Sequence, residues 1–232
     1  MQEFIDDSLG RVVVRRHHNA RGIRFRLSPR RELVATAPPR TPLMLVKTAV
    51  RRSRRDIQKL LDESEHQITY IDSQQIGQSH KLQFISTGAV SAPHARRSAT
   101  TIVVSLPEGM DSSHDEAQAA AQSAVIAAIG REARAYLPRR IATLAERHGY
   151  SYSRIRYTHT TSRWGSCSSS GVISLNIALM KLPLELIDYV LLHELCHTKQ
   201  MNHSDNFWQL VQSADPYWRD HRRRVKSYSP ML

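Results

Sequence analysis

Three histidines and one glutamate lie close together near the C-terminus, in the stretch VLLHELCHTKQMNHSDNFW (residues 190–208). Residues four apart share one face of an α-helix, so His193 and His197 are expected to point the same way. Glu194 lies about 100° further round that helix. With this H-E-x-x-H spacing, two imidazoles hold a metal ion while the glutamate reaches the water to be activated. The pattern predicts a metal-dependent hydrolase.

A catalytic zinc ion needs a third protein ligand and an open position. We expect the third ligand to be His203, which the same helix cannot supply because it comes ten residues after the first histidine. The chain must turn back, and Asn202 is expected to end the helix in the left-handed conformation that asparagine tolerates. If His203 does not bind, Asp215 or Asp220 is the alternative ligand.

The expected chemistry follows from these ligands. Zinc lowers the pKa of its water towards about 7, and Glu194 accepts the proton as general base. Three imidazoles, from His193, His197 and His203, favour one zinc ion per chain, although nickel, cobalt and iron bind similar groups. A buried helix with hydrogen-bonded histidines is the alternative. Two histidines and a glutamate in apolar surroundings are costly unless something binds them, which favours the metal.

The elements that must position these residues change in character along the chain. Short strands are expected near 11–16, 22–27 and 32–37, and again within 66–106. An alanine-rich helix follows. Ser113 is its expected cap, Pro138 is expected to kink or divide it, and Gly149 is expected to end it.

A hairpin is expected next, with its tip near residues 168–171, and then helices over about 183–201 and 205–214. The strand VISLN (172–176) either pairs with an extended peptide substrate or is only structural. We therefore predict an α+β fold with a basic, strand-rich N-terminal region, 1–110, and a hydrolase domain, 111–232.

Positive charge is concentrated at the N-terminus. The net charge is +12, and residues 1–60 hold fifteen Lys and Arg against five Asp and Glu. Such a surface attracts polyanions, so nucleic acid or a nucleotide is a possible partner of the N-terminal region; a merely solvated surface is the alternative. The chain has no motif that reads RNA or DNA, and only 6% of its residues are aromatic.

Composition also predicts where the protein works. No segment approaches the 18 to 20 apolar residues that cross a bilayer, so we expect no membrane partner. The start, MQEFIDDSLG, lacks the basic-then-apolar order of a signal peptide. Two cysteines, Cys167 and Cys196, are too few for a disulfide framework. These features together predict a cytoplasmic protein.

Two segments, VLLHELCHTKQMNHSDNFW and SRWGSCSSSGVISLNIALMKLP (162–183), resemble the YgjP-like metallopeptidases, relatives of the SprT-like and WLM zincins. The resemblance implies a zincin-like domain and a peptide or unfolded-protein substrate. It also implies zinc ligation by His193, His197 and His203 and a base role for Glu194. Within the second segment, Trp164 and Gly165 are expected to pack and turn, and Arg163 to pair with a carboxylate rather than stabilise an oxyanion.

Two other functions would use the same residues. A water-activating metal near many arginines could hydrolyse a nucleotide phosphoanhydride, as a pyrophosphatase does, although no phosphate-cradling glycine motif is present. Alternatively, the chain could be a nucleic-acid-associated protein with a structural zinc ion. Glu194 and a three-ligand site with an open position argue against that alternative.

Overall fold

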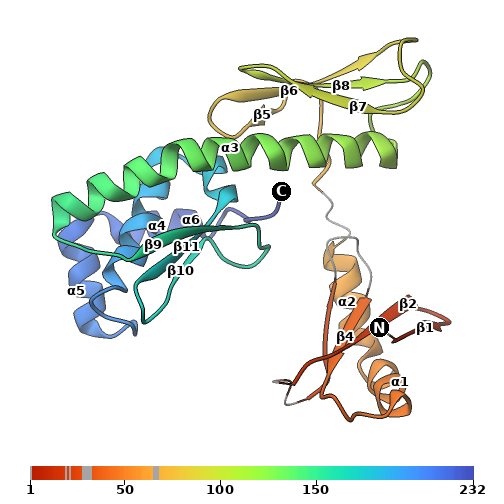
Figure 1. Ribbon diagram of the computed structural model, residues 1–232, viewed down its shortest axis with the longest axis horizontal. Helices are drawn as coiled ribbons and strands as arrows, with labels where there is room; N and C mark the ends of the chain where they lie inside the picture. The colour runs from red at the N-terminus through yellow and green to blue at the C-terminus, as the bar shows by residue number, and fades with distance from the viewer. Residues whose placement is uncertain (1, 19, 21, 28–32, 65–67) are drawn as a thin grey trace. The chain divides into compact units, whose positions relative to one another are not determined.

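The computed structural model describes residues 2–18, 20, 22–27, 33–64 and 68–232, and it confirms a mixed α+β protein (Figure 1). The chain forms two compact units, Met1–Gln67 and Ile68–Leu232. The division therefore lies well before residue 110, the boundary expected from sequence. The reason is that the strands between residues 68 and 110 pack on the long helix that follows them.

The first unit is a sheet with two helices. Its elements are β1 (Gln2–Asp6), β2 (Gly10–Arg16), β3 (Arg24–Leu27), β4 (Leu33–Ala37), α1 (Leu43–Arg52) and α2 (Arg54–Ser64). The strand order is β1-β2-β4-β3, with β2 and β4 parallel. Val12 and Val14 of β2 pack with Val46 and Ile57 of the helices in a core of their own. The strands predicted at 11–16 and 22–27 are confirmed; residue 32 of the third lies outside the described residues.

The second unit begins with another four-stranded sheet. Its strands are β5 (Gln75–Ile76), β6 (His80–Ser86), β7 (His94–Arg97) and β8 (Thr101–Leu106), in the order β5-β6-β8-β7. Leu82, Ile102 and Val104 are fully buried and join a core that includes Ala121 and Val125 of helix α3 (Asp115–His148). Figure 1 shows this sheet lying along one side of α3.

Helix α3 departs from expectation at its cap, and of the two outcomes expected at Pro138, a kink or a division, the division does not occur. Its N-cap is His114, whose Nδ1 accepts a hydrogen bond from the amide of Glu116 at 3.4 Å, so Ser113 is not the cap. The helix continues through Pro138 undivided. Proline costs one backbone hydrogen bond, and the burial of Leu137 and Ile141 offsets that cost. Gly149 ends the helix with φ +65°, as predicted.

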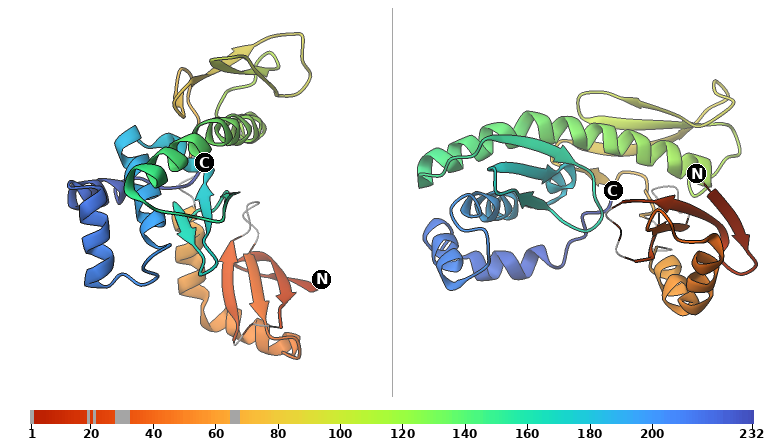
Figure 2. Two further views of the ribbon diagram at one scale, coloured as in Figure 1. Left: turned by 60° about the vertical axis from the view of Figure 1, so that its left-hand side comes forward. Right: turned by 60° about the horizontal axis from the view of Figure 1, so that its bottom comes forward.

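A smaller sheet and three helices lie on a different side of α3 from the β5–β8 sheet (Figure 2). The strands are β9 (Arg154–Thr158), β10 (Gly165–Cys167) and β11 (Val172–Asn176), in the order β10-β11-β9. The hairpin of β10 and β11 is confirmed, and β9 adds a parallel neighbour to β11. A 3-10 helix, Ile177–Lys181, leads into α4 (Leu184–Cys196), α5 (Asp205–Ala214) and α6 (Trp218–Val225). None of the helices in the described ranges is both long and apolar enough to cross a membrane.

Candidate metal centre

Helix α4 carries the H-E-x-x-H residues at its C-terminal end. Most of its side chains are buried. His193 and Glu194 lie in its last turn, and His197 follows as the C-cap with helical angles of φ −63° and ψ −20°. The amide of His197 donates to the carbonyl of His193 at 3.4 Å. The i, i+4 relation that places two imidazoles on one face therefore persists to the end of the helix.

The turn after α4 brings His203 back without a left-handed residue. Among the described non-glycine residues, Ser73 alone has a positive φ, so the conformation expected for Asn202 is wrong. The side chain of Gln200 holds the turn instead, because its Nε2 donates to Asn202 Oδ1 at 2.6 Å and to Ser204 Oγ at 3.2 Å. Ser204 is the N-cap of α5. The side-chain amide of Gln200 thus stabilises the turn that a left-handed Asn202 was expected to form.

The three histidine rings converge. The Nε2 atoms of His193 and His203 lie 3.1 Å apart. One nitrogen from each ring, including that of His197, lies within 4.8 Å of the others. The Nδ1 of His197 lies 3.1 Å from the carbonyl oxygen of Gln200, to which it donates. This bond leaves the lone pair on His197 Nε2, the arrangement that ligating histidines use.

An aromatic frame holds the rings. The Phe207 ring centroid lies 4.4–4.9 Å from those of all three histidines, and Trp208 stacks on His203 at 5.6 Å. Burial, together with the charges of the other two imidazoles and Arg222, lowers the pKa of His193 to about 3. His193 is therefore neutral at pH 7, which is the form that binds a metal.

These residues fit a divalent metal ion. A tetrahedral ion bound by two nitrogens at about 2.0–2.1 Å holds them roughly 3.3 Å apart, close to the observed His193–His203 separation. The buried Nδ1 of His193 has no hydrogen-bond partner, so the cluster is not a set of satisfied core histidines. His203 is exposed, which gives solvent and substrate access.

Glu194 lies against strand β10. It is 5% exposed, and its Oε2 has no hydrogen-bond partner. Burial raises the pKa of Glu194 to about 8, although the charge of Arg163 opposes the shift. A Cβ on Gly165 would come within 2.7 Å of Glu194 Oε1. Gly165 thus permits close approach, a role that sequence reasoning missed even though glycine inside a strand signals it.

Other candidates from the sequence lie elsewhere. Arg163 forms no close ion pair with any described carboxylate, and its expected interaction with a carboxylate is limited to the effect of its charge on Glu194. Asp215 accepts from His221 Nδ1 at 2.7 Å, and Asp220 pairs with Arg223, so both alternative carboxylate ligands have other partners. Burial raises the pKa of Cys167, and the negative charge of Glu194 raises it further.

Strand β11 is not available to a substrate. It lies between β10 and β9, and both of its edges form ladders. Of the two alternatives left open for residues 172–176, pairing with a peptide is therefore wrong, and the strand is structural. In this sheet the strand that combines an edge position with contact to Glu194 is β10.

A helical H-E-x-x-H motif, a converging third histidine and a buried glutamate define a metal-dependent hydrolase. The chain matches the YgjP-like metallopeptidase domain over residues 21–228 and belongs to this family.

Two solved structures are similar to part of the chain, and no curated protein matches it. The metallopeptidase zymogen of Pyrococcus abyssi abylysin is 25% identical, covers 39% of this chain and 91% of its own, and has a TM-score of 0.36. The metallopeptidase zymogen of Methanocaldococcus jannaschii jannalysin is 18% identical, covers 39% and 93%, and has a TM-score of 0.35. Both scores are low, so the assignment rests on the family match.

Proposed function

We propose that this metallopeptidase binds one zinc ion through His193, His197 and His203 and uses Glu194 as general base on peptides or unfolded proteins. The observation that carries the proposal is the convergence of three imidazole nitrogens within 4.8 Å beside a buried carboxylate without a partner. The neutral state of His193 and the hydrogen bond that orients His197 support the ligand assignment.

When bound, zinc supplies a Lewis acid that polarises a carbonyl group and acidifies water. The residues of the chain supply the proton transfers. Glu194 Oε2 has no competing hydrogen bond, so it is free to accept a proton from the attacking water. The protonated Glu194 then donates that proton to the amine nitrogen as the peptide bond breaks. Its burial against Gly165 excludes bulk water from the carboxylate.

The free edge of β10 is the proposed binding site for the peptide backbone. One edge of β10 pairs with β11, and no other described strand pairs with it. Extended peptides add to such edges through main-chain hydrogen bonds. Because Gly165 of β10 touches Glu194, a peptide paired there would pass beside the base.

We also place this activity in the cytoplasm as part of the proposal. Cys167 and Cys196 are both free thiols. Cys196 is buried, and its Sγ lies 3.2 Å from the Tyr150 hydroxyl in the core. Unpaired cysteines fit a reducing compartment. Cell fractionation followed by immunodetection of the protein is the direct check.

The decisive experiment compares the wild type with Glu194→Gln and His203→Ala. Each full-length protein is stripped of metal, reloaded with zinc and assayed for bound zinc and for cleavage of an unfolded protein. We expect Glu194→Gln to keep one zinc ion and lose cleavage, and His203→Ala to lose zinc. His221→Ala is the matched control, since His221 pairs with Asp215, and it should keep zinc.

Two results would contradict the proposal. Loss of zinc from Glu194→Gln would make the glutamate a ligand rather than a base. Release of phosphate from nucleoside triphosphates that disappears in Glu194→Gln, without peptide cleavage by the wild type, would favour the phosphoanhydride hydrolase. Binding to DNA or RNA, measured with rising salt, tests the basic N-terminal region separately.

A further inference from the structure

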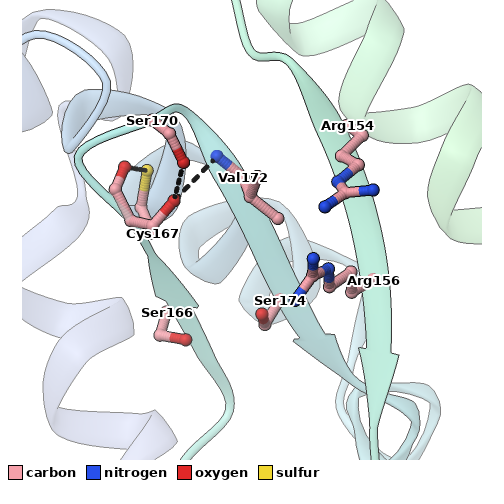
Figure 3. Close-up of a pocket in the computed structure, with 8 residues that line it drawn as sticks. Arg154, Arg156, Ser166, Cys167, Ser170, Val172 and Ser174 are labelled. Atoms are coloured by element: carbon pink, nitrogen blue, oxygen red, sulfur yellow. Dashed lines mark hydrogen bonds between the residues drawn. The ribbon is translucent and has the colours of Figure 1, made fainter.

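One face of the β9–β11 sheet carries arginine and serine side chains around a hollow of about 290 Å³ (Figure 3). Ile173 and Leu175 of β11 point into the core. Because strand residues alternate between faces, Val172 and Ser174 point the other way, into the hollow. The hollow is lined by Arg154, Arg156, Ser166, Cys167, Ser168, Ser170, Val172 and Ser174.

The strand register sets the order of these groups across the sheet. Ser166 of β10 pairs with Ser174 of β11, which pairs with Arg156 of β9. In the next row on the same face, Val172 pairs with Arg154. Figure 3 shows the Arg156 side chain extending from β9 towards Ser174. Cations from one edge strand thus stand beside hydroxyl groups from the other two strands.

The chemistry of this face suits an anion. No lining residue is acidic, and neither Arg154 nor Arg156 forms an ion pair or hydrogen bond with any residue in the described ranges. Arginine binds carboxylate and phosphate oxygens through its planar set of donors. The hydroxyls of Ser166 and Ser174 add neutral donors without repelling negative charge.

The hollow lies next to the edge of β10, the strand at which we propose that the peptide binds. Gly165 contacts Glu194, and the neighbouring residue Ser166 lines the hollow. A peptide paired with that edge would alternate in the same way, with one side chain on the Glu194 side and the next beside the hollow. That strand would lie three strand spacings, about 14 Å, from β9. The Arg156 side chain, extending across β11, and an acidic side chain of the peptide, extending across β10, would together span this distance.

We propose that this arginine–serine face is a specificity subsite that binds a carboxylate or phosphate group on a side chain of the extended peptide substrate. The inference rests on the proposed peptidase function and adds a substrate class to it. Both anions offer the same oxygen acceptors to Arg154 and Arg156, so peptides that carry glutamate or phosphoserine distinguish them.

The test compares matched peptides and matched variants of the full-length, zinc-loaded protein. Peptides that differ only by Gln or Glu, or by Ser or phosphoserine, are scanned along the positions around the scissile bond. We expect one position where the acidic residue raises kcat/KM by about three- to tenfold, through KM. In Arg154→Gln/Arg156→Gln this ratio should fall to near one.

Arg131→Gln/Arg139→Gln is the matched control, because it removes the same charge from exposed positions of α3 and should keep the preference. An acidic preference that is absent in the wild type, or that survives in Arg154→Gln/Arg156→Gln, would overturn the subsite.

Equilibrium binding of the same fluorescent peptides separates the two proposals. If no peptide is cleaved but the acidic peptide binds in a manner that depends on Arg154 and Arg156, the peptidase proposal fails and the anion site stands. If peptides are cleaved and binding does not depend on these arginines, the anion site fails alone. Inorganic phosphate at millimolar concentration should compete with the acidic peptide and not with its neutral match.

Discussion

Two buried carboxylates, Asp6 in the first unit and Glu194 in the second, differ in their partners. Asp6 Oδ1 accepts hydrogen bonds from the amides of Ser8 and Leu9 and from Arg54 Nη2, at 3.1–3.2 Å. Glu194 is 5% exposed against 9% for Asp6, and its Oε2 has no hydrogen-bond partner among the described residues. The Asp6 carboxylate, which stabilises the fold, accepts hydrogen bonds. The Glu194 carboxylate, to which we assign proton transfer, accepts none at Oε2, and burial without a donor costs stability.

The pKa shifts of the two groups run in opposite directions. Burial raises the pKa of Asp6, but the hydrogen bonds from Ser8 and Leu9 and the charge of Arg54 outweigh it and lower the pKa overall. For Glu194, burial dominates and raises the pKa to about 8. Both side chains are nearly covered, but Glu194 lies deep in the larger unit, so burial has a greater effect on its pKa, and Asp6 has hydrogen-bond donors that Glu194 Oε2 lacks.

The largest effect is expected from Gly165→Ala, which should disturb the position of Glu194. The added Cβ would lie 2.7–2.9 Å from three atoms of the Glu194 side chain and would displace it. We expect kcat/KM to fall about 100-fold with zinc retained, because small displacements of a reacting group are costly. Gly22→Ala is the control, because the added Cβ would have no atom of the described residues within 4 Å apart from its chain neighbours. Full peptidase activity in Gly165→Ala would show that the contact with β10 does not position Glu194.

Removing the satisfied carboxylate should affect stability and not catalysis. Asp6→Ala leaves two amides and a guanidinium without their acceptor, which costs roughly 1–3 kcal/mol in the unfolding of residues 2–64. Urea unfolding, followed by hydrogen exchange in that segment, measures the loss. Zinc content and peptide cleavage should match the wild type. A drop in cleavage at full zinc content would contradict the division of roles.

Removing the Glu194 carboxylate, which has no partner at Oε2, should increase stability. In metal-free protein at pH 9, above the raised pKa of Glu194, Glu194→Gln should raise the free energy of unfolding by roughly 1 kcal/mol, because a neutral amide is less costly to bury than an unpartnered carboxylate. Thermal unfolding of the two proteins gives the difference. Glu146→Gln, at an exposed position of α3, should change stability by less than about 0.5 kcal/mol. A destabilised Glu194→Gln protein would mean that the glutamate has structural partners.

The smallest expected effect is a pH dependence in the first unit. A carboxyl group whose pKa is lowered on folding contributes stability that is fully present above its unfolded pKa, about 3.9, and is lost as pH falls through the folded pKa. Between pH 5 and pH 2 the wild type should therefore lose more stability in residues 2–64 than Asp6→Asn does. Parallel acid unfolding curves for the two proteins would contradict the lowered pKa of Asp6.

Much of the site could be predicted because its rules are local. The i, i+4 spacing of His193 and His197 needs only the helical period, and the return of His203 needs only a turn. The placement of Glu194 against Gly165 was not predictable in the same way, because it depends on a strand that precedes α4 by about twenty residues. The detail of the turn was wrong since Gln200 supplies hydrogen bonds that backbone propensity does not reveal.

The limits of prediction for the fold have a similar cause. Hydrophobic alternation predicted strands such as β2 and the β10–β11 hairpin, but not which strands would become neighbours. The parallel pairing of β9 with β11 decided that residues 172–176 are interior to the sheet. Likewise, Pro138 lacks the N–H group for one helical hydrogen bond, but burial of the residues around it keeps α3 continuous.

Helix α3 packs against both the β5–β8 sheet and the C-terminal helices of the second unit. Its 34 residues extend about 51 Å, and the β5–β8 sheet lies on one side of it while the helices that carry the three histidines lie on another. Neither flank can detach without exposing buried alanine and leucine of α3. We therefore expect residues 68–232 to unfold as one cooperative body, so that a destabilising change in the β5–β8 sheet also reduces the fraction of molecules in which the three histidines converge.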